Sequence, residues 1–126
     1  MELATMHPNA QRMLQTIEAF NRGDFSTVGD MFSPDAVWHA AGRNPYAGDL
    51  RGEAIGEWFA TMGKLSAQVE PEDIIASDTH VAFFLRVRGE GLDQVHANAW
   101  RFVDGKATEG WFLPDDQEAW DAWSTR

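Results

Sequence analysis

Apolar residues in the first half of the chain recur with the spacing of helices. Residues 8–22 are predicted to form a helix, because one face carries apolar side chains at i, i+3, i+4 and i+7: Ala10, Met13, Leu14, Ile17 and Phe20. Pro8 suits the first helical position, and Gly23 suits the position after the last. Asp24 is a capping residue for a second, shorter helix that Ser33-Pro34 ends. A third helix is predicted over residues 52–63.

From Leu65 onward the apolar period changes to two, which is typical of strands. The strands predicted from this period cover residues 65–75, 81–88, 94–103 and 106–113. Pro71 indicates a bulge or an edge position in the first of them, and Asp104-Gly105 is a two-residue hairpin signal between the last two. A short strand over residues 36–39 and a loop over residues 40–51 precede the third helix, and an acidic helical segment over residues 115–123 ends the chain.

This order of elements predicts an α+β fold with helices packed on one face of a curved sheet. A helix does not cover a strongly bent sheet completely, so an apolar interior open at one end is expected. No internal repeat, low-complexity tract or linker interrupts residues 1–126, which are therefore assigned to a single domain.

Composition narrows the function. Six Trp and eight Phe are many for 126 residues, and they can supply a core or line an apolar cavity. The net charge of −10 argues against nucleic acid and anionic membranes as partners, because phosphate binding needs clustered Lys and Arg. The chain has no cysteine, leader-like segment or apolar stretch long enough for a bilayer, so a cytoplasmic protein is expected.

The strand over residues 94–103 presents two very different faces. One face carries polar and aromatic side chains: Gln94, His96, Asn98, Trp100 and Phe102. The other carries a mainly aliphatic set: Val95, Ala97, Ala99, Arg101 and Val103. If the aliphatic face lies inside, His96 and Asn98 are solvated. If it lies outside, these polar groups are buried together and need partners or a ligand, because unpaired burial costs free energy.

His39, beside Trp38 at the mouth of the loop, is the first candidate for chemistry. A lone histidine on an apolar strand is also commonly a core or rim residue, and both interpretations stay open at this point.

Two stretches of the chain resemble SnoaL-like polyketide cyclases: DAVWHAAGRNPYAGDLRGEAIGEWF and HANAWRFVDGKATEGW. That family belongs to the cone-shaped superfold shared with nuclear transport factor 2 and the ketosteroid isomerases. The resemblance covers almost the whole chain and implies a cone-shaped antiparallel sheet with three helices on its concave side. The superfold hosts isomerases, cyclases, dehydratases, epoxide hydrolases and binding modules, so the resemblance is more specific for the fold than for the reaction.

The resemblance also implies roles for individual residues. His39 falls at the position of the isomerase general base, and Asn98 falls at that of the protonated oxyanion-hole acid. Thr16 falls where the first helix carries the oxyanion-hole tyrosine, and Phe59 falls near a pocket tyrosine. All acid and base positions thus differ from the isomerases, although Asn98 donates hydrogen bonds without any pKa shift and His39 titrates near neutrality.

The working hypothesis is proton abstraction next to a carbonyl. His39 acts as the base, Asn98 stabilises the developing enolate, and His96 orients His39 or carries a second proton. The predicted ligand is a small apolar ring, held by Thr16, Phe20, Trp38, Phe59, Trp100 and Phe112.

Several alternatives remain open. The main one is a non-catalytic binding module or dimeric scaffold, and epoxide hydrolase or dehydratase chemistry is a further one. No metal and no cofactor are predicted, because His39 and His96 lack a short-range ligand spacing. A homodimer through the outer face of the sheet is implied by the resemblance, and the row Val95, Ala97 and Ala99 is compatible with it. Asp115 lies where related cyclases place an acid or base.

Overall fold

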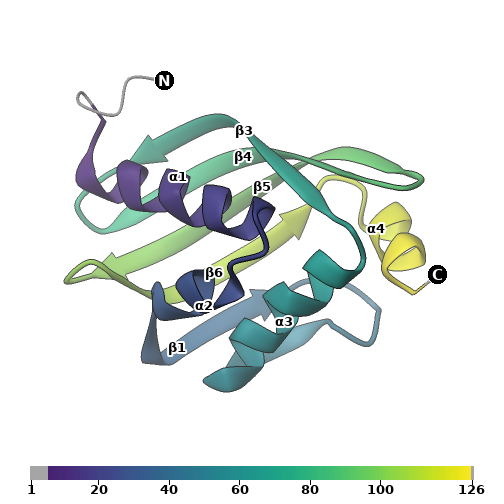
Figure 1. Ribbon diagram of the computed structural model, residues 1–126, viewed down its shortest axis with the longest axis horizontal. Helices are drawn as coiled ribbons and strands as arrows, with labels where there is room; N and C mark the ends of the chain where they lie inside the picture. The colour runs from purple at the N-terminus through teal and green to yellow at the C-terminus, as the bar shows by residue number, and fades with distance from the viewer. Residues whose placement is uncertain (1–5, 126) are drawn as a thin grey trace.

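A six-stranded sheet forms the frame of the computed structural model, which describes residues 6–125 (Figure 1). Its strand order is β2-β1-β6-β5-β4-β3. All neighbours are antiparallel except β1 and β6, which run parallel. The strands are β1 (Phe32–Ala40), β2 (Gly48–Arg51), β3 (Gln68–Ala76), β4 (His80–Gly89), β5 (Leu92–Val103) and β6 (Lys106–Pro114).

Three helices cover one face of this sheet, as predicted: α1 (Pro8–Asn21), α2 (Phe25–Asp30) and α3 (Glu53–Lys64). Their apolar faces turn toward the sheet and bury Met13, Ile17, Trp58 and Met62. Asp24 caps α2 as expected, since its carboxylate accepts a hydrogen bond from the Thr27 backbone N–H at 3.2 Å. The α+β architecture is therefore confirmed.

A fourth helix, α4 (Gln117–Ser124), lies at one end of the sheet rather than on its face (Figure 1). Trp120 and Trp123 are buried beneath it, in agreement with their amphipathic spacing. Asp121 ties this helix to the β1–β2 loop, because its carboxylate accepts hydrogen bonds from the Arg43 backbone N–H at 3.0 Å and from Asn44 at 2.7 Å.

The segment around the short predicted strand differs from the sequence-based expectation. β1 begins at Phe32 rather than at Ala36, and the expected loop over residues 40–51 contains β2. Ser33 and Pro34 fit in the strand because the β1–β6 register shifts between Phe32 and Val37, where ladder hydrogen bonds are interrupted. The extension depends on a parallel pairing with β6, about 70 residues away in the sequence, which local periodicity does not report.

The face of β5 that carries the polar and aromatic side chains is the inner face. Burial alternates along the strand, and the inner residues are Gln94, His96, Asn98, Trp100 and Phe102. Helices cover this inner face, so three polar side chains are placed in a largely aromatic core. None of the helices in the described part of the chain is long and apolar enough to cross a membrane.

Candidate functional site

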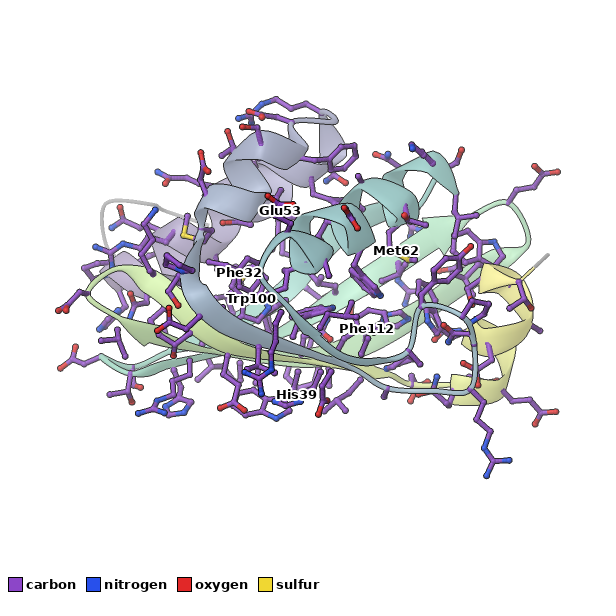
Figure 2. The ribbon with its side chains drawn as sticks, turned by 90° about the horizontal axis from the view of Figure 1, so that it is seen from below. Phe32, His39, Glu53, Met62, Trp100 and Phe112 are labelled. Atoms are coloured by element: carbon purple, nitrogen blue, oxygen red, sulfur yellow. The ribbon has the colours of Figure 1, made fainter. Side chains whose placement is uncertain are left out.

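A cavity of about 70 Å³ lies between the helices and the inner face of the sheet. All six predicted ligand-binding residues line it: Thr16, Phe20, Trp38, Phe59, Trp100 and Phe112. Asn98 joins them from β5. In Figure 2, Trp100 and Phe112 lie between the sheet and the helices, on the side of the sheet that faces α3.

Aromatic rings fill most of the space around this cavity. Trp38 lies within 5.1 Å of Phe59 and 5.3 Å of Trp58, measured between ring centroids, and Phe112 lies 4.9 Å from Trp58. Pockets for drug-sized ligands usually enclose about 300–1,000 Å³. A ring-shaped guest therefore enters only when some of these side chains shift.

Asn98 is a lining residue of the cavity whose amide keeps an unused hydrogen-bond donor. Its Oδ1 accepts a hydrogen bond from the Leu113 backbone N–H at 3.0 Å, which sets the orientation of the amide. Within residues 6–125, no group accepts a hydrogen bond from its Nδ2. The Asn98 amide therefore keeps a donor for a guest that reaches it.

Thr16 lines the cavity, but its hydroxyl is already engaged. Its Oγ1 donates to the Arg12 carbonyl oxygen at 2.8 Å, one turn back along α1. Only oxygen lone pairs remain for a guest, so Thr16 in this arrangement accepts hydrogen bonds and does not replace the tyrosine donor of the isomerases.

His96 is fully buried and does not itself line the cavity. It packs edge-on against Phe112 and Trp120, which do line it. Its Nε2 lies 2.9 Å from Gln94 Oε1, an acceptor, so Nε2 carries the proton and Nδ1 keeps its lone pair. That Nδ1 has no partner in the described chain. Burial lowers the pKa of His96 to about 4, so the imidazole is neutral at neutral pH.

His39 does not line the cavity, and the prediction that it shares a hollow with Asn98 is wrong. Its neighbour Trp38 points inward, so strand alternation turns His39 to the outer face, where Figure 2 shows it below the sheet. Its Nδ1 lies 2.7 Å from Asp49 Oδ1, and its Nε2 lies 2.6 Å from Glu109 Oε2. Hydrogen bonds to Asp49 and then to Glu109 raise the pKa of His39.

This position also removes the predicted contact between the two histidines. His96 faces inward and His39 faces outward, where it stacks on Trp111. His96 therefore cannot orient His39 across the sheet.

Two indole groups in the cavity wall lack hydrogen-bond acceptors. Trp38 Nε1 and Trp100 Nε1 are buried and have no partner in residues 6–125. Trp58, another indole of the wall, differs, because its Nε1 donates to the Tyr46 carbonyl oxygen at 3.1 Å. A buried donor without an acceptor costs about 1–3 kcal/mol of folding free energy. The unpaired N–H groups of Trp38 and Trp100 therefore lower the stability of the free protein.

Charged groups are missing from the described cavity wall. The lining includes no Asp, Glu, Lys or Arg among residues 6–125, and Arg101 is exposed on the outer face of β5. Asp115 is also exposed and lies outside this wall. In the same part of the chain, no group of three or more His, Cys, Asp or Glu side chains is arranged to hold a metal ion.

Some wall residues were not predicted as ligand-binding. Trp58 and Met62 were expected on the inner face of the third helix, so a face-by-face survey of that helix identifies them. Trp120 reaches the cavity from α4, whose position no local pattern reports.

The sequence matches the family model of the SnoaL-like domain over residues 12–110. The chain belongs to the SnoaL-like family. No functionally curated protein matches it. Other solved structures with the same fold are described as NTF2-like proteins, which confirms the nuclear transport factor 2-like architecture.

Three solved structures illustrate the range of similar proteins. Bal32a, from a soil-derived mobile gene cassette, is 30% identical, with a TM-score of 0.84 over 92% of this chain and 95% of its own. TerC, co-crystallised with polyporic acid, is 21% identical, with a TM-score of 0.81 over 95% of this chain and 100% of its own. A putative polyketide cyclase from Sinorhizobium meliloti is 18% identical, with a TM-score of 0.72 over 90% of this chain and 100% of its own.

Proposed function

We propose that this SnoaL-like protein binds a small, apolar, ring-shaped molecule and acts on it as an isomerase or cyclase, by proton abstraction next to a carbonyl. The observation that carries the proposal is the pair His96 and Asn98 on the inner face of β5. One has a buried nitrogen lone pair without a partner, and the other has a free amide donor. Enolisation needs a base and a hydrogen-bond donor, and these two side chains lie two residues apart on one strand face. Only Asn98 lines the cavity, so His96 reaches a guest when the rings of Phe112 and Trp120 shift.

In this mechanism His96 takes the role first predicted for His39. The neutral imidazole accepts a proton from the carbon next to the carbonyl, and Asn98 Nδ2 donates to the oxygen as it gains charge. If the ring carries a C=C bond next to this carbon, the enolate is conjugated with it, and the imidazolium returns its proton to the far carbon of that bond, which moves the double bond and completes an isomerisation. Alternatively, the enolate carbon forms a bond to a second carbonyl carbon, whose oxygen receives the proton. Burial among aromatic rings lowers the pKa of His96 to about 4, which favours proton return and makes the neutral imidazole a weaker base in the first step.

The exchange of acidic C–H groups with solvent deuterium tests this proposal. The probe is 2-tetralone, a ring ketone with acidic protons, and loss of its proton signals in D₂O is followed by NMR. We expect His96→Gln and Asn98→Leu each to slow enzyme-dependent exchange by about a hundredfold or more. Wild-type exchange no faster than in buffer, or unchanged exchange in both variants, rules the proposal out.

His39→Gln is the matched histidine variant in the same assay. Its side chain lies on the outer face of the sheet, away from the cavity. Exchange that is lost in His39→Gln and kept in His96→Gln would overturn the assignment of the base to His96.

A non-catalytic binding module is the second candidate function. The observation that favours it is the packing of the cavity, in which rings dominate and charged groups are missing from the described wall. Tight binding of the ring ketone without enhanced exchange would support this candidate. Epoxide hydrolase or dehydratase chemistry has less support, because a water-activating carboxylate is absent from the described lining.

A homodimer through the outer face of the sheet is part of the proposal. Phe84, Ala97 and Leu113 lie side by side on β4, β5 and β6, and Phe84 and Leu113 are 40% and 49% exposed. Exposed apolar rows of this kind are typical of protein interfaces. The cytoplasmic location and the assignment of residues 1–126 to one domain stay predictions.

A further inference from the structure

Trp38, Gly110 and Trp100 form one row across three neighbouring strands. Trp38 of β1 is paired with Gly110 of β6, and Gly110 is paired with Trp100 of β5. A Cβ atom at position 110 would lie 2.4 Å from Trp38 Cε3 and 3.5 Å from Trp100 Cδ1. The missing side chain at Gly110 therefore gives the two indoles room to meet, with ring centroids 5.9 Å apart.

Both indoles carry a buried N–H group that has no acceptor in residues 6–125. Trp38 is 2% exposed and Trp100 is 3% exposed, and both line the cavity. Buried N–H groups of Trp usually have a hydrogen-bond partner, so two neighbouring exceptions in one cavity wall call for a physical reason. Gly110 brings the two rings together in the row, although both N–H groups are covered in the free protein. A guest with acceptor atoms would satisfy them once the rings shift to admit it.

We propose that Trp38 and Trp100 are specificity-determining residues, which donate hydrogen bonds through their indole N–H groups to oxygen atoms of the bound ring. The ligand class is then an oxygenated ring, such as a ring ketone, quinone or phenol, rather than a hydrocarbon of the same shape. This inference rests on the proposed ligand-binding function and deepens it. Asn98, two residues before Trp100 on the same face of β5, adds a further donor to the same wall.

The competing explanation is internal to the protein. Trp38 and Trp100 meet edge to face, with an angle of 83° between their rings, and an indole N–H can donate weakly to an aromatic face. In that case the donors are already used, and the cavity has no preference for oxygen. The two explanations predict different ligand selectivity.

A pair of ligands of matched shape separates these explanations. Acetophenone and α-methylstyrene differ in one position, where a C=O group replaces a C=CH₂ group. Dissociation constants for both compounds are measured by calorimetry with the full-length protein. If the indoles donate to the guest, we expect acetophenone to bind more tightly, by about three- to tenfold for each hydrogen bond formed.

Substitutions by phenylalanine remove the N–H groups and keep an aromatic ring. Trp38→Phe and Trp100→Phe are expected to lower the preference for acetophenone by about three- to tenfold each. Trp58→Phe is the matched control, because Trp58 lines the same cavity but its N–H already donates to Tyr46. This control should weaken the binding of both compounds by similar factors and keep their ratio.

An NMR measurement on the unsubstituted protein tests the inference even when the variants do not fold. The indole N–H signals of Trp38 and Trp100 should move downfield with acetophenone and not with α-methylstyrene. Equal affinity for the two compounds, or indole signals that respond to both alike, overturns this inference while leaving the ligand-binding proposal intact. If neither compound binds, the ligand-binding proposal and this inference both fail.

Discussion

His39 and His96 show how the surroundings of one side-chain type decide its chemistry. His39 lies on the outer face between Asp49 and Glu109, and hydrogen bonds to these carboxylates raise its pKa. His96 lies inside, and burial lowers its pKa to about 4. The His39 imidazole is therefore stabilised as a cation, and its hydrogen bonds link β1 to β2 and β6. The His96 imidazole is held in its neutral form.

The raised pKa of His39 predicts a pH dependence of stability. The folded protein holds the His39 proton more tightly than the unfolded chain does, so this contribution is complete below the unfolded pKa of about 6.5. It is lost as pH rises through the raised pKa of the folded state. Because Asp49 is 69% exposed, we expect a loss of about 1 kcal/mol or less.

Urea unfolding of wild type and His39→Gln over a pH series measures this effect. The variant should lack the fall in the free energy of unfolding above about pH 6.5 that His39 contributes. His80→Gln is the control, because His80 is exposed and has no carboxylate partner in the described chain. Parallel pH profiles for wild type and His39→Gln would show that the two carboxylates do not hold the proton.

At the scale of elements, β6 owes its central place to pairing on both sides. It is hydrogen-bonded to β5 through a hairpin at Asp104 and Gly105, whose φ angles of 49° and 78° suit such a turn. Its other neighbour is β1, in parallel. Gly110 lies in the middle of β6, where the indoles of both neighbouring strands pack over it.

Gly110→Ala tests this packing between strands. The new methyl group would lie 2.4 Å and 2.5 Å from atoms of the Trp38 ring, in a buried position where neighbours have little room. We expect the free energy of unfolding to fall by about 1–3 kcal/mol.

Gly56→Ala is the matched control for this substitution. Gly56 lies within α3 and has open space around its would-be Cβ. Alanine there should stabilise the protein by about 0.5–1 kcal/mol, because it favours helix. Thermal or urea unfolding of both variants measures the difference, and a neutral effect of Gly110→Ala would mean that the Trp38 ring moves without cost.

At the scale of the whole molecule, the sheet separates two environments. The inner face meets the helices and encloses the aromatic cavity, while the outer face carries His39 (Figure 2). The exposed row Phe84, Ala97 and Leu113 lies on the outer face as well. The proposed ligand site and the proposed dimer contact therefore lie on opposite sides of one layer of strands. Changes on the outer face should alter association without removing the cavity.

Phe84→Glu tests the dimer contact. A charge at the β4 end of the apolar row should shift the protein from dimer to monomer, because a buried, unpaired carboxylate is costly. Light scattering after size-exclusion chromatography measures the mass. Val103→Glu is the control, since Val103 is 47% exposed but lies at the end of β5. A wild-type protein that is already monomeric at high concentration contradicts the prediction.

Local patterns in the sequence determined most elements of this protein. The helix periods, Pro8 at the first helical position, the cap at Asp24 and the hairpin at Asp104-Gly105 act over a few residues, so they are visible without the fold. The polar and aromatic face of β5 was also recognisable, and with it Asn98, His96 and Trp100. The resemblance to SnoaL-like proteins added the fold and most of the aromatic wall.

Only the tertiary structure decided which face of each strand is inside and which side chains share a cavity. β1 lies between β2 and β6, in a register that turns Trp38 toward the inside. Because neighbouring residues of a strand face opposite sides, His39 faces outward. The Trp38–Gly110–Trp100 row likewise depends on the register between strands far apart in the sequence. Register is a property of paired strands, so no single segment of the chain contains it.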